Sequence, residues 1–130
     1  MSEVIRRPFL RFIAVGLLNT AVGLAAVYIA GHVLGANSFA ANAIGLATGF
    51  AVGYQVNRLW TFSSTESVAM TAPRYLVAFA MAYALNAAIL AALLRSGSLP
   101  TILAQAIALS AYSLAFYLLC RRAVFPAAGR

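Results

Sequence analysis

The stretch from Gly45 to Phe62 reads GLATGFAVGYQVNRLWTF, and it decides the fold of this chain. Its first part holds Gly45, Gly49 and Gly53, spaced four residues apart. On a helix these positions stack on one ridge that carries no side chains. In lipid, such a ridge lets a neighbouring helix approach closely. The stretch therefore predicts a closely packed helix in a membrane.

The second part of the stretch marks the end of this helix. Asn57 is the next position on the glycine ridge, and Arg58 follows it directly. Trp60 and Phe62 come next, and aromatic side chains near a basic residue are typical of the membrane–water interface. We predict that Trp60 and Phe62 are interface aromatics and that the helix leaves the bilayer here.

The composition supports a membrane protein. Of the 130 residues, 64% are hydrophobic and 8% are charged. All nine basic residues are arginines, the only acids are Glu3 and Glu66, and the net charge is +7. No soluble part remains to present a basic surface to nucleic acid, so we expect anionic lipids as partners instead. The single cysteine excludes an intrachain disulfide.

Four apolar runs predict four transmembrane helices in an all-α membrane protein. Each run is about 20 residues long, enough to cross the hydrocarbon core of a bilayer, and a backbone without water must be helical. The runs are Phe12–Leu34, Ser38–Asn57, Tyr75–Leu94 and Leu99–Leu119.

The connections pair these helices into two hairpins. Residues 35–37 and 96–100 are predicted to form tight turns, which join the first helix to the second and the third to the fourth. The polar segment from Ser63 to Pro73 is the only longer loop that we expect. The chain is thus predicted to be a single four-helix transmembrane domain over residues 1–130.

The arginines predict the orientation. Eight of the nine fall on one side of the four-helix arrangement, and Arg95 alone falls on the other. The positive-inside rule then places both termini in the cytoplasm. The eight are Arg6, Arg7, Arg11, Arg58, Arg74, Arg121, Arg122 and Arg130.

The two hairpins also resemble each other in sequence. A shift of 63 residues places Arg11 on Arg74 and Arg58 on Arg121, and it matches further residues without a gap. The further matches are Tyr54 with Tyr117, Phe62 with Phe125, and Asn42 with Gln105. We predict a parallel repeat, with one unit at about residues 11–62 and the other at about 74–125.

Four segments resemble the signatures of the GtrA-like family. The first half carries RFIAVGLLNTAVG (residues 11–23) and GFAVGYQVNRLWTF (residues 49–62). The second half carries RYLVAFAMAYALN (residues 74–86) and FYLLCRRAVF (residues 116–125). The second half departs from the pattern, because Cys120 precedes Arg121 where a polar pair is common and Ala123 stands in the position of Trp60. We therefore expect fewer polar ligand contacts from the second half.

The resemblance implies a small four-span protein of the bacterial inner membrane that handles polyprenyl-phosphate-linked sugars. Such proteins are assigned to translocating these lipids, or to assisting the glycosyltransferases that use them. Both functions stay open from the sequence. A small multidrug-resistance-type exporter is a third hypothesis, and the lack of a carboxylate in the first span counts against it.

Four arginines are candidates for binding the lipid phosphate: Arg58, Arg11, Arg74 and Arg121. They lie at the cytoplasmic ends of the four predicted spans, at matched positions in the repeat. A guanidinium binds phosphate with two hydrogen bonds and is weakly hydrated. Topology anchoring is the alternative role for the same residues.

Amide side chains within or at the ends of the spans are candidates for a polar track that holds sugar hydroxyls. Interhelical hydrogen bonding is the alternative role, because amides in lipid must find partners. These residues are Asn57, Gln55, Asn19, Asn86, Asn42 and Gln105. In the first span, Gly16, Asn19, Thr20 and Gly23 are predicted to share one face.

No acidic residue falls inside a predicted span, and no catalytic dyad, metal cluster or phosphate-binding loop is recognisable. We therefore predict a protein that is not an enzyme, with no catalytic residues, no metal site and no cofactor. The expected partners are a polyprenyl-phosphate-linked sugar, anionic lipids, a membrane glycosyltransferase and a second copy of the chain in a homodimer.

Overall fold

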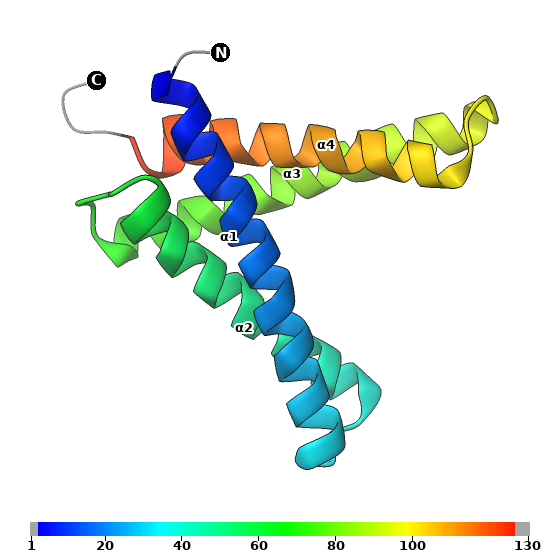
Figure 1. Ribbon diagram of the computed structural model, residues 1–130, viewed down its shortest axis with the longest axis horizontal. Helices are drawn as coiled ribbons and strands as arrows, with labels where there is room; N and C mark the ends of the chain where they lie inside the picture. Colours follow the sequence, from blue (N-terminus) through cyan, green and yellow to red (C-terminus); the bar gives the residue numbers. More distant parts are fainter. Residues whose placement is uncertain (1–2, 127–130) are drawn as a thin grey trace. The chain divides into compact units, whose positions relative to one another are not determined.

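The computed structural model describes residues 3–126, apart from the side chain of Ile5. The chain forms two compact units, Met1–Ser63 and Ser64–Arg130. In each unit two long helices run side by side and are joined by a short turn (Figure 1). All regular structure in the described part of the chain is helical, and the prediction of an all-helical protein is confirmed.

The first unit is a helical hairpin in which each helix ends in a wider, π-helical turn. Its elements are α1 (Glu3–Tyr28), the π-turn η1 (Ile29–Val33), α2 (Ser38–Val56) and the π-turn η2 (Asn57–Thr61). Gly35 has a φ of 76° and so allows the chain to reverse between the two helices. The side chain of Asn37 then accepts a hydrogen bond from the Ala40 N–H at 2.9 Å and caps α2.

The second unit is also a helical hairpin, but its first helix has no π-turn at its end. Its elements are α3 (Val68–Ser96), α4 (Thr101–Leu119) and the π-turn η3 (Cys120–Val124). Gly97 has a φ of 64° and ends α3 in the left-handed conformation.

Helix α3 begins earlier than the sequence predicted. The expected loop from Ser63 to Pro73 is wrong in its second half, because α3 starts at Val68 and includes Pro73. The hydroxyl of Ser67 accepts a hydrogen bond from the Met70 N–H at 3.3 Å and caps the helix. Pro73 lies in the second turn and removes one helical hydrogen bond, and α3 continues through it to Ser96.

The element bounds of the two units correspond at an offset of 63 residues. Helices α2 and α4 begin at residues 38 and 101, and η2 and η3 begin at residues 57 and 120. The ring of Phe12 lies 6.3 Å from that of Phe62, and the ring of Tyr75 lies 6.1 Å from that of Phe125. The parallel repeat stays a prediction, which this correspondence supports.

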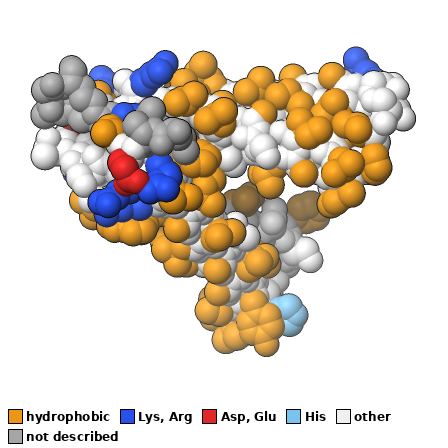
Figure 2. Space-filling view, turned by 45° about the horizontal axis from the view of Figure 1, so that its top comes forward, with side chains coloured by type: hydrophobic (Ala, Val, Ile, Leu, Met, Phe, Trp, Pro, Cys, Tyr) orange, Lys and Arg blue, Asp and Glu red, His pale blue; other side chains and the backbone are white. Residues whose placement is uncertain are grey.

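The outer faces of the helices are apolar. Figure 2 shows hydrophobic side chains over much of the helical surface, with basic side chains in a few groups. Leu17 is 71% exposed in α1 and Leu109 is 59% exposed in α4. Exposing these apolar faces to water would cost free energy, whereas exposing them to lipid does not. The protein is a membrane protein.

Three helical segments are long and apolar enough to cross a membrane: Arg6–Val33, Val68–Ser96 and Thr101–Val124. Helix α2 with η2 is not among them. This helix contains Asn42, Gln55 and the three ridge glycines. Four helices are present, as predicted, but the fourth membrane span stays a prediction.

Candidate functional site

The glycine ridge of α2 packs inside the first hairpin, against α1. Gly45, Gly49 and Gly53 are all buried. A Cβ atom added at Gly45 would collide with a methyl group of Val27, and one added at Gly49 would lie 2.9 Å from the backbone oxygen of Asn19. Only glycine allows this approach. The ridge is therefore covered by α1 and is not a free surface for a second copy.

Asn19 is the polar residue that α1 places on this ridge. A Cβ atom at Gly49 would lie 2.7 Å from its Oδ1, and one at Gly53 would lie 3.2 Å from its Nδ2. The Oδ1 atom is buried and accepts no hydrogen bond from the part of the chain that the structure describes. Asn19 thus places a buried acceptor between α1 and the glycine ridge.

The predicted polar face of α1 is narrower than expected. Gly16 and Thr20 are exposed, and a Cβ atom at Gly16 would meet nothing within 4 Å. The Thr20 hydroxyl donates to the Gly16 carbonyl oxygen at 3.0 Å, so its hydrogen bond is formed within α1. Asn19 and Gly23 are the two members of the face that contact α2.

The π-turn η2 continues the ridge with a buried polar pair. Asn57 is 3% exposed and Thr61 is 5% exposed. The Thr61 hydroxyl donates to Oδ1 of Asn57 at 2.8 Å, and the Phe62 N–H donates to the Asn57 carbonyl oxygen at 2.9 Å. Such wide turns are frequent at functional sites. Within this turn Arg58 is half-buried, whereas Trp60 is exposed.

Arg11 and Trp60 meet across the hairpin, although 49 residues separate them in sequence. The Arg11 Nη1 atom donates to the Trp60 carbonyl oxygen at 3.2 Å, and the guanidinium carbon lies 5.0 Å from the centre of the Trp60 ring. Both partners are uncharged, so they orient the guanidinium and leave its charge in place. A guanidinium has five N–H donors, and Arg11 is exposed.

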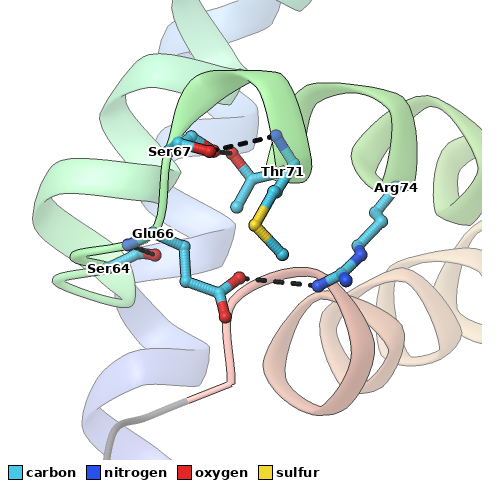
Figure 3. A network of polar contacts seen from close by, with 6 residues as sticks. Ser64, Glu66, Ser67, Thr71 and Arg74 are labelled. Atoms are coloured by element: carbon cyan, nitrogen blue, oxygen red, sulfur yellow. Dashed lines mark hydrogen bonds and ion pairs between the residues drawn. The ribbon is translucent and has the colours of Figure 1, made fainter.

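The matched arginines of the second unit have other partners. Arg121 donates to the hydroxyl of Tyr117 at 3.5 Å, and Tyr117 is buried. Arg74 forms an ion pair with Glu66, with 3.5 Å between Nη1 and Oε2 (Figure 3). The position equivalent to Trp60 is Ala123, so no tryptophan ring stands at the place that corresponds to the partner of Arg11.

The interior of the second unit is apolar where that of the first is polar. At the 63-residue offset, Asn19 corresponds to Ala82, Gly49 to Tyr112, Gly53 to Phe116, Asn57 to Cys120 and Thr61 to Val124. The space left open by glycine in the first unit is filled by rings here: Tyr75 and Tyr112 lie 5.1 Å and 5.7 Å from Phe116. At these matched positions the first unit is polar and the second is apolar, and Thr71 is the buried polar residue that the second unit has elsewhere in its described part.

The remaining predicted amides do not join this interior. Asn42 and Gln55 lie on the exposed surface of α2, and Gln105 lies on that of α4. Asn86 is half-buried in α3. Phe62 is half-buried with its ring 6.3 Å from that of Phe12, and its role as an interface aromatic stays a prediction. The structure thus brings Arg11 and Trp60 together, and it places Asn19 against the glycine ridge that leads to Asn57.

Sequence reasoning missed two functional candidates, Thr61 and Glu66. Thr61 lies four residues after Asn57, which is the spacing of neighbours on a helix. Glu66 lies eight residues before Arg74, and only the cap at Ser67 turns the loop so that the two side chains meet. Among residues 3–126, no three His, Cys, Asp or Glu side chains are grouped so that they could hold a metal ion.

A family model described as "GtrA/DPMS, transmembrane domain" matches residues 11–125. The chain belongs to this family. The predicted resemblance is therefore confirmed. No curated protein and no solved structure matches the chain.

The GtrA/DPMS match has the same limits as the predicted repeat. It begins at Arg11 and ends at Phe125, and it includes all four arginines at the matched positions. Glu3, Arg6 and Arg7 lie outside it, and both arginines form ion pairs with Glu3 at the start of α1. The arginines at the N-terminus of this GtrA/DPMS chain are thus separate from the candidate site.

Proposed function

We propose that the protein translocates a polyprenyl-phosphate-linked sugar across the bacterial inner membrane, where the sugar is used for glycosylation of cell-surface polysaccharide. It does so without catalysing a reaction. Membership of the GtrA/DPMS family supports a role with polyprenyl-phosphate-linked sugars. The residues that we assign to the lipid phosphate are Arg58 and Arg11 in the first unit, and Arg74 and Arg121 are the matched candidates within the second unit.

The observation that carries this proposal is the contact between Arg11 and Trp60. It brings a guanidinium of α1 to η2, the turn that contains Arg58. Two guanidinium groups at one end of a hairpin suit the head group of a phospholipid, since each can form two parallel hydrogen bonds with phosphate. Trp60 at the same end is typical of the interface, where this head group lies.

Polar groups below the arginines are the proposed contacts for the sugar. Asn19 has a buried acceptor without a donor among the described residues, and Asn57 lies one ridge position beyond Gly53. Asn86 offers a half-buried amide in α3. A sugar hydroxyl that passes the membrane needs hydrogen-bond partners at this depth, because none come from lipid. These amides supply them.

The membrane arrangement that we propose has four spans and both termini in the cytoplasm. Helix α2 would be the fourth span, because its glycine ridge packs against α1 and its helical length continues through η2. The arginines then lie on the cytoplasmic side, except Arg95.

The test is transport of a labelled polyprenyl-phosphoryl sugar in liposomes that contain the purified protein alone. Arg58→Lys keeps the charge but loses the two-pronged geometry, so we expect a loss of about 1–2 kcal/mol in binding of polyprenyl phosphate and slower transport. Arg6→Lys, outside the family match, is the control. Equal binding by the parent and both variants would reduce Arg58 to a topology anchor.

A scaffold for a glycosyltransferase is the second candidate function. The exposed amides Asn42, Gln55 and Gln105 favour it. An amide that faces lipid is stabilised when it forms a hydrogen bond with another protein. A homodimer would use the same surfaces, since α1 covers the glycine ridge. Binding of the lipid without transport in liposomes would favour the scaffold over the carrier.

A further inference from the structure

We propose that Glu66 is a built-in competitor for phosphate at Arg74. In this proposal the carboxylate occupies the guanidinium that the second unit would otherwise offer to a head group. Phosphate binding then depends mainly on the arginines of the first unit. The inference deepens the proposed function and rests on it, because it concerns which arginines receive the lipid phosphate.

The loop before α3 holds Glu66 toward Arg74. The Glu66 N–H donates to the Ser64 hydroxyl at 3.2 Å, and Ser67 begins the helix by capping it. Thr71 donates to the Ser67 carbonyl oxygen at 2.9 Å and fixes the first turn. Figure 3 shows the Glu66 carboxylate and the Arg74 guanidinium pointing toward each other. These contacts give the carboxylate a defined place within 3.5 Å of Nη1.

The equivalent acid of the first unit does not act in this way. Glu3 precedes Glu66 by 63 residues, but it pairs with Arg6 and Arg7 rather than with Arg11. Arg11 instead contacts the uncharged carbonyl and ring of Trp60. The two matched arginines thus differ in their electrostatic state. Arg11 contacts uncharged groups, whereas Arg74 is paired with a carboxylate.

Carboxylate and phosphate are alternative ligands for a guanidinium, and both accept two parallel hydrogen bonds from it. The side chain of Arg74 is 45% exposed and that of Glu66 is 30% exposed. An ion pair with this exposure is weak, so a phosphate can displace the carboxylate. The displaced carboxylate still repels the phosphate, and the apparent affinity at Arg74 is therefore lowered.

The experiment measures binding of dodecyl phosphate to the purified protein in a neutral detergent at low salt. Glu66→Gln removes the charge with little change of shape, and we expect it to raise the affinity about two- to fivefold, the range of an exposed charge pair. Arg74→Gln alone should change the affinity by less than about twofold. The double variant should lose the gain. Glu3→Gln is the matched control and should leave the affinity unchanged.

Three outcomes would overturn the proposal. They are an unchanged or lower affinity in Glu66→Gln, a gain that persists in the double variant, and an equal gain in Glu3→Gln. Thermal unfolding of each variant checks that it is folded. The expected gain should disappear at about 1 M salt, where exposed charges are screened.

The proposed function is tested separately by transport. If the parent does not transport a polyprenyl-phosphoryl sugar but Glu66→Gln binds phosphate more tightly, the carrier function would be refuted and the role of Glu66 would stand. If the parent transports the sugar lipid but Glu66→Gln shows no gain in affinity, the carrier function would stand and the competitor role of Glu66 would be refuted.

Discussion

Nη1 of Arg11 donates to the carbonyl oxygen of Trp60 at 3.2 Å, and its guanidinium carbon lies 5.0 Å from the centre of the Trp60 ring. This pair joins α1 to the π-turn η2. The second unit has Arg74 and Ala123 at the matched positions. The pair is therefore a feature of one half of the chain only.

Removing the ring should weaken phosphate binding without removing any charge. In Trp60→Leu the carbonyl oxygen still accepts a hydrogen bond, but the cation–π contact is lost, at a cost of about 0.5–1 kcal/mol for an exposed site. We expect a two- to fivefold weaker affinity for polyprenyl phosphate. Trp60→Phe keeps an aromatic face and serves as the control. An affinity in Trp60→Leu equal to that of the parent would show that Arg11 needs no ring to orient it.

The glycine ridge should tolerate no side chain at Gly49. In Gly49→Ala the new Cβ would lie 2.7 Å from Oδ1 and 2.9 Å from the backbone oxygen of Asn19. We expect the hairpin to be destabilised by about 1–3 kcal/mol, as in other overpacked interiors, with a lower unfolding temperature in detergent. Gly16→Ala is the matched change on α1, where the Cβ would meet nothing within 4 Å. It should be neutral or slightly stabilising, and an equal loss in both variants would contradict this packing.

Replacing one member of the buried pair Asn57 and Thr61 should destabilise the first unit more than replacing both. Thr61→Val removes the donor to Oδ1 of Asn57, and we expect a loss of about 1–3 kcal/mol because a buried acceptor loses its partner. The double variant Asn57→Cys/Thr61→Val introduces the pair that the second unit carries, Cys120 and Val124. It should recover part of this loss. A double variant less stable than Thr61→Val, by thermal unfolding, would show that Asn57 stabilises the unit in another way.

The topology should follow the distribution of arginines. A reporter fused after residue 130 is expected on the cytoplasmic side, because eight of the nine arginines fall on one side of the four predicted spans. Arg130 itself lies outside the described residues. As a control, the same reporter inserted in the turn after Arg95 should be found on the periplasmic side. A periplasmic signal from the C-terminal fusion would place the candidate phosphate site on the wrong side.

The sequence by itself determined the class of the protein, its helices and its family. Hydropathy over four runs of about 20 residues and a charge content of 8% leave helices in lipid as the only stable form of such a chain. The spacing of Gly45, Gly49 and Gly53 predicted that another helix packs closely on this ridge, but it did not identify that helix. These properties depend on residue type and spacing, which a single sequence displays.

Only the tertiary structure decided which partners the key residues have. The ridge could pack on α1 or on a second copy, and the contact of Gly49 with Asn19 shows that it packs on α1. The matched arginines look alike in sequence, yet Arg11 contacts Trp60 and Arg74 contacts Glu66. Such pairings arise from how helix ends and loops are placed in space. They are set by the cap at Ser67 and by the π-turns, which periodicity does not encode.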